Sequence, residues 1–378
     1  MKLKDIAVYA KDRIETKDLS VHNYISTENM MSEKGGVQNA SSLPSISFTS
    51  GFTVNDVLTS NIRPYFRKIW FSDKVGGCSN DVLVLRAKGK CNPKFLYYVL
   101  SDNRFFDYST ASAKGTKMPR GDKSAIMEYD VPNFDITEQT KIANFLSSLD
   151  DKIALNQRIN DNLEEQAENI YDKLFHNETL NELVDLGDVI QTTSGGTPRR
   201  SNPYFYEGGT LNWVKSKELN GTFIINTEEL ITDIAITKSA AKILPENSVL
   251  IAMYGATVGE HAVTSKQMAC NQAVCALLPN NNYPYSYLFM FAKRKKEELI
   301  NKAIGSAQQN ISQILVKQLL VSKNVELIKK YDLIVRPFFE KIKKNVMENE
   351  DLSQIRDSLL PKLMSGEISV EEINDLHS

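Results

Sequence analysis

The chain has 378 residues, of which 42% are hydrophobic and 24% charged, and its formal net charge is −2. This length suffices for two ordinary domains, and this composition excludes a disordered or low-complexity chain. A slightly acidic total disfavours indiscriminate binding to nucleic acid, so contact with DNA would require locally clustered positive charge or a partner that supplies it.

The sequence contains no clear motif for export, membrane insertion or metal binding. The opening MKLKDIAVYAK lacks the apolar core of a signal peptide, and no run approaches the roughly 18 apolar residues that span a bilayer. We therefore expect a cytoplasmic protein without a membrane partner. The cysteines show no CxxC spacing and the chain has only four histidines, so we expect reduced thiols, no metal site and no cofactor.

Residues 1–135 are predicted to form a first globular domain. Strand-like runs begin at Asp56 (DVLTSNI) and Asp81 (DVLVLRA), and a helix is predicted from Pro93 to Phe106. A loop rich in Ser, Gly and Asn, 32–50, precedes these elements. A second loop, 113–123, carries four cations around two glycines: Lys114, Lys117, Arg120 and Lys123.

The stretch from Ile136 to Phe175 is predicted to form one long helix, the centre of a spacer segment, 136–179. It contains neither Pro nor Gly, and its apolar residues recur in alternating steps of four and three. That spacing is the heptad pattern of a coiled-coil seam. Asn156 and Asn160 interrupt the seam at its middle.

Residues 180–324 repeat the order of elements of the first domain with a different amino-acid sequence. Val249-Leu250 lies 192 positions after Val57-Leu58, and Cys270 lies 192 after Cys78. An aromatic helix returns at 285–291, and the loop GSAQQNIS begins at Gly305 as the earlier loop begins near Gly115. The chain is therefore interpreted as a tandem duplication of one globular domain and one helix.

The second seam lies in the last segment, 325–378, where Asn345 and Asn349 each stand 189 positions after Asn156 and Asn160. Because a proline inside a helix removes a hydrogen bond, we expect this helix to be less regular or to begin after Pro337. Antiparallel pairing of the two helices would place Asn156 opposite Asn349 and Asn160 opposite Asn345. Such a layer penalises other registers; the alternative is that these side chains face solvent.

The predicted fold class is α+β. Two globular domains are separated by a pair of long antiparallel coiled-coil helices, and a pseudo-two-fold axis relates the halves. Such an arrangement would hold two similar domains a fixed distance apart.

The whole plan resembles the DNA-specificity subunit of type I restriction-modification systems. The resemblance is carried by TEQTKIANFLSSLDDKIALNQRINDNLEEQAENIYDKLF, by its echo DLSQIRDSLLPKLMSGEI, and by LGDVIQTTSGGTPRRSNPYFYEGGTLNWVKSKEL, which is similar to the opening of a target-recognition domain. HNYISTENM, from His22, stands where LNWVKSKEL stands in the second domain, but no GGTP precedes it.

The resemblance implies a non-catalytic subunit whose domains, 1–135 and 180–324, each read one half of an asymmetric, bipartite site in double-stranded DNA. It implies docking of two methyltransferase (modification) subunits, with a restriction and translocase subunit as a further partner. A coiled-coil scaffold or dimerisation protein without DNA readout is the alternative, and a self-sufficient methyltransferase or nuclease is a third reading.

Candidate DNA contacts are Arg, Lys, Asn and Gln in equivalent loops, with glycines that allow close approach of the backbone. In the first domain these are Arg63, Lys68, Lys114, Lys117, Arg120 and Lys123. In the second domain they are Arg199, Arg200, Lys215, Tyr254, Gly255, Gln308, Gln309 and Asn310. The basic run 293–296 (KRKK) is followed by two glutamates on a predicted helix, which is more typical of a solvated face.

No catalytic residues are predicted. An adenine methyltransferase needs a (D/N/S)PP(Y/F) loop, and Asn202-Pro203-Tyr204 lacks the second proline, so a turn is the simpler interpretation. A P-loop GxxxxGK[ST] is also missing from the sequence.

Overall fold

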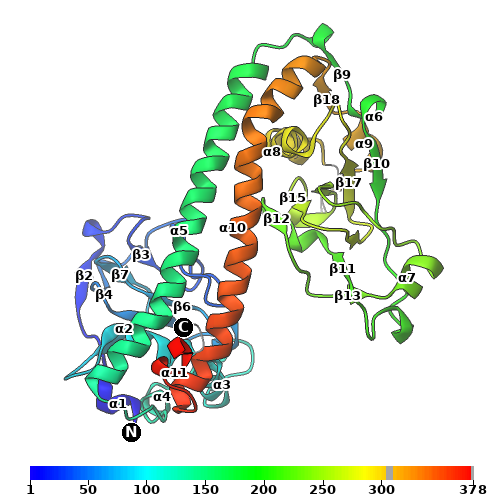
Figure 1. Ribbon diagram of the computed structural model, residues 1–378. Helices are drawn as coiled ribbons and strands as arrows, with labels where there is room; N and C mark the ends of the chain where they lie inside the picture. Colours follow the sequence, from blue (N-terminus) through cyan, green and yellow to red (C-terminus); the bar gives the residue numbers. More distant parts are fainter. Residues whose placement is uncertain (304–309, 376–378) are drawn as a thin grey trace. The chain divides into compact units, whose positions relative to one another are not determined.

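The computed structural model describes residues 1–303 and 310–375 and divides into two compact units. Unit 1 contains residues 1–152 and the C-terminal segment from Leu352, and unit 2 contains residues 153–351. Two long helices, α5 (Ile136–Phe175) and α10 (Val325–Ser365), lie side by side within each unit, and each contributes a segment to both units (Figure 1). Each unit therefore consists of a sheet-containing domain and a segment of the helix pair.

Helix α10 does not begin after Pro337 as expected, because it runs without interruption through both Pro337 and Pro361. Each proline leaves free the carbonyl four residues earlier, at Leu333 and at Asp357. Leu333 is 80% exposed and Asp357 is also exposed. Water can therefore bond both carbonyls, and packing of the opposite face holds the helix together.

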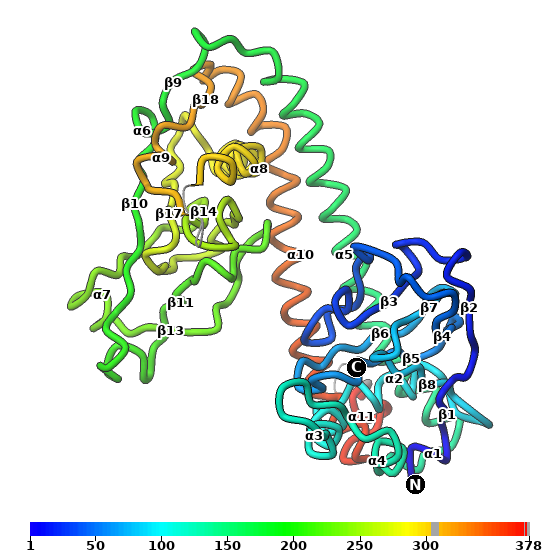
Figure 2. Tube along the Cα trace, turned by 180° about the vertical axis from the view of Figure 1, so that it is seen from behind, coloured from blue at the N-terminus to red at the C-terminus, as the bar shows by residue number. Residues whose placement is uncertain are grey.

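Unit 1 carries two sheets, with strand orders β1-β8-β5-β6 and β2-β4-β7-β3. Its strands are β1 (Ala7–Tyr9), β2 (Arg13–Glu15), β3 (Tyr24–Ile25), β4 (Phe48–Phe52), β5 (Val57–Ser60), β6 (Ile69–Phe71), β7 (Gly76–Cys78) and β8 (Val82–Ala87). Its shorter helices are α1 (Leu3–Ile6), α2 (Pro93–Ser101), α3 (Asn103–Ala111), α4 (Lys123–Met127) and α11 (Val370–Asp375). The first and last segments of the chain both belong to this unit, as the tube shows (Figure 2).

The helix predicted over 93–106 is two helices, α2 and α3. Asp102 has extended backbone angles and its carboxylate accepts a hydrogen bond from the backbone N–H of Arg104. This is the geometry of an N-cap, which starts a new helix instead of continuing the old one. The aromatic periodicity on both sides of Asp102 concealed the break.

Unit 2 carries sheets of order β10-β17-β14-β15-β12, β13-β11-β16 and β18-β9. Its strands are β9 (Leu183–Asp185), β10 (Gln191–Ser194), β11 (Leu211–Val214), β12 (Phe223–Ile224), β13 (Leu230–Ile231), β14 (Val249–Ala252), β15 (His261–Thr264), β16 (Ala269–Cys270), β17 (Val274–Leu278) and β18 (Leu320–Ser322). Its shorter helices are α6 (Leu186–Val189), α7 (Asp233–Lys238), α8 (Tyr285–Lys302) and α9 (Gln313–Lys317).

The duplication inferred from the sequence is visible in the strand pairing. In unit 1, β3 runs parallel to β7 and places Ile25 opposite Cys78. In unit 2, β11 runs parallel to β16 and places Val214 opposite Cys270. Because parallel pairing of two short strands requires a long connection, its recurrence at matching residues confirms the α+β class with an internal repeat.

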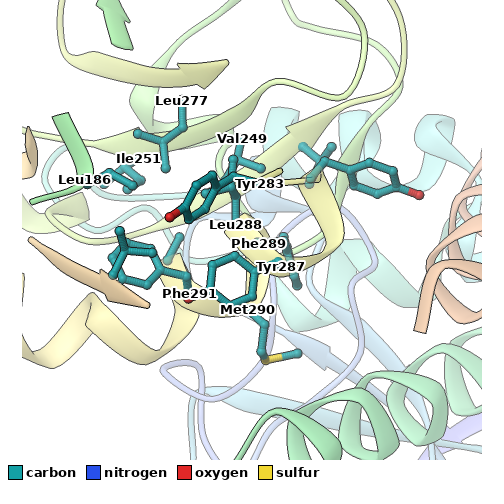
Figure 3. Close-up of a cluster of buried hydrophobic side chains, with 14 of the residues drawn as sticks. Leu186, Val249, Ile251, Leu277, Tyr283, Tyr287, Leu288, Phe289, Met290 and Phe291 are labelled. Carbon is teal, nitrogen blue, oxygen red and sulfur yellow. The ribbon is translucent and has the colours of Figure 1, made fainter. Parts of the chain in front are cut away.

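Each unit has its own hydrophobic core against the helix pair. In unit 1, Leu146 of α5 and Leu363 of α10 are fully buried together with residues of α1, α2 and α3. In unit 2 the core is rich in aromatic rings from α8, including Tyr287, Phe289 and Phe291 (Figure 3). Such rings each bury a large apolar area, so α8 anchors the second domain to the long helices.

No helix in the described part of the chain combines the length and the apolar character that crossing a membrane requires. The four cysteines are free. Burial raises the pKa of Cys78, Cys270 and Cys275 to about 12, so these thiols stay protonated and unreactive at neutral pH.

His261 on β15 makes unit 2 sensitive to acid. Its imidazole is 5% exposed, its ring centroid lies 4.9 Å from that of Phe289, and burial lowers its pKa to about 4. The unfolded chain, with the ordinary pKa near 6.5, therefore binds a proton that the folded unit excludes. Above pH about 6.5, His261 does not lower the free energy of unfolding. Below that pH it lowers this free energy by about 1.4 kcal/mol per pH unit, down to pH about 4.

We expect His261→Phe to remove this component of the acid sensitivity. The check is hydrogen–deuterium exchange of β15 and α8 peptides between pH 7 and pH 4.5, corrected for intrinsic exchange. His22→Phe, an exposed histidine of unit 1, is the control. An unchanged pH dependence in His261→Phe would contradict the assignment.

Candidate nucleic-acid interface

In unit 1 the structure brings Arg63 and the loop 113–123 together. The backbone N–H of Arg63 donates to the carbonyl of Pro119 at 2.8 Å, and Ile62 forms an isolated bridge with Arg120. The loop is closed on itself by two backbone hydrogen bonds between Lys114 and Arg120, of 2.9 and 3.0 Å. Two segments that are far apart in sequence thus form one surface feature, which we call the first loop pair (61–68 with 113–123).

The cations of the first loop pair differ in their freedom. Lys114 bonds Asp122 at 2.6 Å, which raises the Lys114 pKa, and Arg120 pairs with Asp81 at 3.0 Å. Lys117 and Lys123 are exposed, and no side-chain partner is found for them among the described residues. These two lysines are the positive charges of the loop that are available to a ligand.

Lys68 and Arg63 are less available than the sequence indicated. The Lys68 ammonium donates to the carbonyl of Thr27 at 2.7 Å and lies 5.8 Å from the centre of the Phe66 ring, and burial lowers its pKa. The Nε of Arg63 is buried, and Arg63 adopts a left-handed backbone conformation (φ 50°). Both side chains support the loop from within.

A polar hollow that the sequence did not single out lies in the same domain. Its volume is about 330 Å³, and Asp81, the partner of Arg120, is part of its wall. Amides and hydroxyls provide much of the rest: Ser26, Asn29, Gln38, Asn39, Ser41 and Ser42. Such groups can donate to or accept from base edges. The only signal in the sequence was the Ser-, Gly- and Asn-rich composition of 32–50.

In unit 2 the loop GGTPRR, Gly195–Arg200, is held in place by hydrogen bonds to Cys270 and Trp213. The N–H of Gly196 donates to Cys270 O at 2.9 Å, and the indole of Trp213 donates to Gly196 O at 3.1 Å. A Cβ on Gly195 would lie 2.0 Å from Cys270 O. Close packing of this backbone therefore requires the glycines, and it sets the position from which Arg199 and Arg200 extend.

The two arginines of this loop have different environments. Arg200 pairs with Glu229 and its guanidinium lies 4.8 Å from the Tyr206 ring centre and 5.1 Å from that of Trp213. Lys215 contacts the same Glu229 at 2.5 Å. Hydrogen bonds from Arg200 and Lys215 hold the pKa of Glu229 below its ordinary value. Arg199 is exposed, and the described part of the chain supplies it with no ion-pair partner.

Tyr254, Gly255 and Asn310 form the counterpart of the first loop pair. Tyr254 is 39% exposed and forms an isolated bridge with Asn310, as Ile62 does with Arg120. Gly255 has a φ of 69°, which a residue with a side chain rarely adopts. Gln308 and Gln309 lie outside the described residues. We call 254–259 with Asn310 the second loop pair.

The basic run 293–296 is paired with carboxylates and is not the solvated face that the sequence indicated. Lys293 contacts Glu164 and Glu168 of α5 at 2.7 and 2.8 Å, and Arg294 contacts Glu168 at 3.0 Å. Lys295 pairs with Glu298 and Lys296 with Glu260. Lys293 and Arg294 therefore attach α8 to α5, and all four cations of the run have carboxylate partners.

The four seam asparagines are brought together in two pairs. The Nδ2 of Asn156 donates to Asn349 Oδ1 at 2.9 Å, and the Nδ2 of Asn345 donates to Asn160 Oδ1 at 2.7 Å. Asn156 and Asn345 are both 0% exposed, so the solvent-facing alternative is wrong for them. Within unit 2, α5 and α10 therefore run antiparallel around a polar layer.

The chemistry of the described residues does not suggest a reaction centre. None of their His, Cys, Asp and Glu side chains form a group of three that could hold a metal ion. Asn202 caps a short 3₁₀ turn at Pro203–Phe205, and Tyr204 is 72% exposed. The tripeptide 202–204 is thus a surface turn.

Comparisons with known proteins give a consistent result. The family model for the type I restriction modification DNA specificity domain matches residues 1–165 and 179–322. The MjaIX specificity subunit of Methanocaldococcus jannaschii is 26% identical over 304 residues, which are 74% of this chain and 70% of that protein. The HindI specificity subunit of Haemophilus influenzae is 29% identical over 192 residues, which are 50% of this chain and 41% of that protein.

A solved structure shares the fold. The S subunit of a type I restriction-modification system from M. genitalium covers 96% of this chain and 95% of its own, with a TM-score of 0.59 and 18% sequence identity. At that identity the likeness concerns the arrangement of the chain and not its residues.

We expect the free cations to bind DNA phosphates and the paired ones to contribute less. The double variant Lys117→Ala/Lys123→Ala should weaken binding to duplexes of any sequence and make the salt dependence of log K shallower by about 0.9 for each phosphate that is no longer neutralised. Lys4→Ala, which removes a lysine paired with Glu128 in the same unit, is the matched control. The measurement is a series of DNA-binding titrations between 50 and 300 mM salt. Equal slopes of log K against log salt in the native protein, the double variant and the control would show that the loop does not contact phosphates.

Proposed function

The chain belongs to the family of type I restriction-modification DNA specificity domains, and we propose that its two globular domains each read one half of a split, asymmetric DNA site. As a specificity subunit it is a DNA-recognition component and not the catalytic one. The reading domains are residues 1–135 and 180–324, and the segments 136–179 and 325–378 hold them apart. Its proposed partners are double-stranded DNA, two modification subunits and, where present, a restriction and translocase subunit, and its proposed location is the cytoplasm.

The repetition of one loop pair in both domains is the observation that carries this proposal. Both domains bridge a loop after a central strand to a loop before a short helix, at Ile62–Arg120 and at Tyr254–Asn310. The first pair is rich in lysine and arginine, whereas the second contains an aromatic ring, two glycines and the amide of Asn310. Two readers on one scaffold with different side chains would recognise different half-sites.

The remaining candidates act as supports or as phosphate contacts in this proposal. Arg199, Lys117 and Lys123 neutralise phosphates, because no ion pair within the described residues competes for them. Arg200 and Lys215 are held by Glu229 in one fixed geometry, which suits a directional contact more than a general one. Arg63 and Lys68 set the shape of the first loop pair.

The separation of the half-sites would follow from the length of the helix pair. Helix α5 continues from unit 1 into unit 2, and α10 does the same in the opposite direction. The asparagine layer supports this assignment, because a shifted register would leave Asn156 or Asn345 against apolar residues. We propose that Asn156, Asn160, Asn345 and Asn349 set the register that fixes the spacer.

The direct test is to co-express the chain with its methyltransferase subunits and to map modified bases by single-molecule sequencing. The proposal expects a split, asymmetric motif with a fixed gap. A stable complex that modifies no defined sequence would instead support a scaffold without DNA readout.

Exchange of residues 1–135 for the corresponding domain of a relative should replace one half of the motif and leave the other unchanged. The reciprocal exchange of residues 180–324 is the matched control and should alter only the other half. Both halves changing together in either chimera would contradict independent reading.

Lengthening both helices by one heptad tests the spacer. Seven residues inserted after Asn160 and seven before Asn345 keep the seam in phase and add about 10 Å. At about 3.4 Å per base pair, the unread gap should grow by about three base pairs. The same seven residues inserted at Gly208, an exposed turn, should leave the gap unchanged. Altered half-site bases in the lengthened protein would oppose the spacer assignment.

A further inference from the structure

The amide–amide pairs of the asparagine layer do not by themselves determine which helix pairs with which. Because α5 and α10 repeat one seam, α5 could also pair antiparallel with α5 of a second copy, with Asn156 opposite Asn160 of that copy. The same amide–amide pairs would then form, although Asn156 would lose the hydrogen bond that its Nδ2 donates to Glu348 Oε2 at 2.9 Å, and α10 could pair with itself in the same way. A protein with two such helices needs another device to keep unlike helices together.

One layer of the seam breaks the symmetry. In unit 1, Arg356 of α10 bonds Asp150 of α5 at 2.6 Å, and the Tyr98 hydroxyl donates to the other oxygen of Asp150 at 2.6 Å. Arg356 also contacts Asp357 at 2.9 Å, and Lys34 lines the same small hollow. The Arg356 and Asp150 side chains are only 22% and 29% exposed.

The repeat-related layer in unit 2 is apolar. The counterparts of Asp150 and Arg356, each 189 positions away, are Phe339 and Ala167. Phe339 is 1% exposed and Ala167 is 0% exposed. The Phe339 ring contacts Phe289 at 5.3 Å between centroids. The layer that is ionic in one unit is thus aromatic and methyl in the other.

Like-with-like pairing would therefore mismatch this layer. Pairing of α5 with α5 would place Asp150 opposite Ala167, and pairing of α10 with α10 would place Arg356 opposite Phe339. Each removes the opposite charge from the facing helix, so Asp150 would keep only the Tyr98 hydroxyl and Arg356 only the exposed Asp357, which is unfavourable for partly buried charges. We propose that the Asp150–Arg356 pair selects the unlike pairing α5–α10 over pairing of like helices between two copies. This selection is independent of DNA reading.

A cross-link reports like-helix pairing directly. Lys141 and Lys173 of one α5 are separated by 32 residues of helix, about 48 Å, which exceeds the reach of a lysine-reactive cross-linker. In an antiparallel α5–α5 pair centred between Asn156 and Asn160, Lys141 of one copy would lie close to Lys173 of the other. A Lys141–Lys173 cross-link is therefore specific for this state.

The test uses the full-length chain in two double variants. Asp150→Asn/Arg356→Gln neutralises the pair at nearly constant shape, and Asp150→Arg/Arg356→Asp reverses it. The control Asp56→Asn/Arg86→Gln neutralises another ion pair of unit 1, between Arg86 Nε and Asp56 Oδ1 at 2.7 Å, remote from the seam. Circular dichroism establishes the fold of each variant, native mass spectrometry measures the two-copy fraction, and peptide mapping locates the cross-link.

The neutral variant should show the Lys141–Lys173 cross-link and a two-copy fraction raised by about tenfold or more. The native, reversed and control proteins should not. A folded neutral variant without the cross-link would overturn the proposal, as would an equal yield in the native protein. Failure of the neutral variant to fold would also overturn it, because a pair that only selects a partner can be neutralised without loss of the fold.

Discussion

The packing of α5 against α10 is the contact on which the rest of this protein depends. The largest buried core of each unit includes residues of both helices, so neither domain completes that core without them. The chain must therefore return to its first domain after completing the second, and Leu360, Leu363 and Met364 close the core that Leu3 begins. An error in the helix pair would thus disturb both domains at once.

The contact surfaces of the two domains on the helices differ in chemistry. In unit 2 a cluster of aromatic rings joins α8 to α5 and α10, and Lys293 and Arg294 add ion pairs to the acidic face of α5. In unit 1 the corresponding region includes the Tyr98–Asp150–Arg356 contact. Burial of rings stabilises without preference for one partner, whereas a partly buried ion pair discriminates between partners because each charge requires the other.

Most of the basic side chains proposed to face DNA are paired with carboxylates, as fits a net charge of −2. Asp81, Asp122 and Glu229 each hold a basic side chain of a loop, and few basic side chains there remain unpaired within the described residues. Held cations lose little conformational freedom on binding, but a phosphate must compete with their carboxylates. A paired cation is therefore expected to bind DNA only where the hydrogen-bond geometry is good, and such directional contacts are the ones that discriminate between sequences.

The sequence by itself determined the duplication, the two long helices and the pairing of the asparagines, because these depend on periodicity and on a constant offset within the chain. It also placed the strands at 57 and 82 and the matching residues Cys78 and Cys270. Only the tertiary structure decided which cations are free, since Arg120, Arg200 and Lys293 meet carboxylates from distant segments. It likewise decided that α10 passes through Pro337, because the carbonyl that this proline leaves free faces solvent. The GGTPRR loop is held by Cys270 and Trp213, which come from distant parts of the sequence.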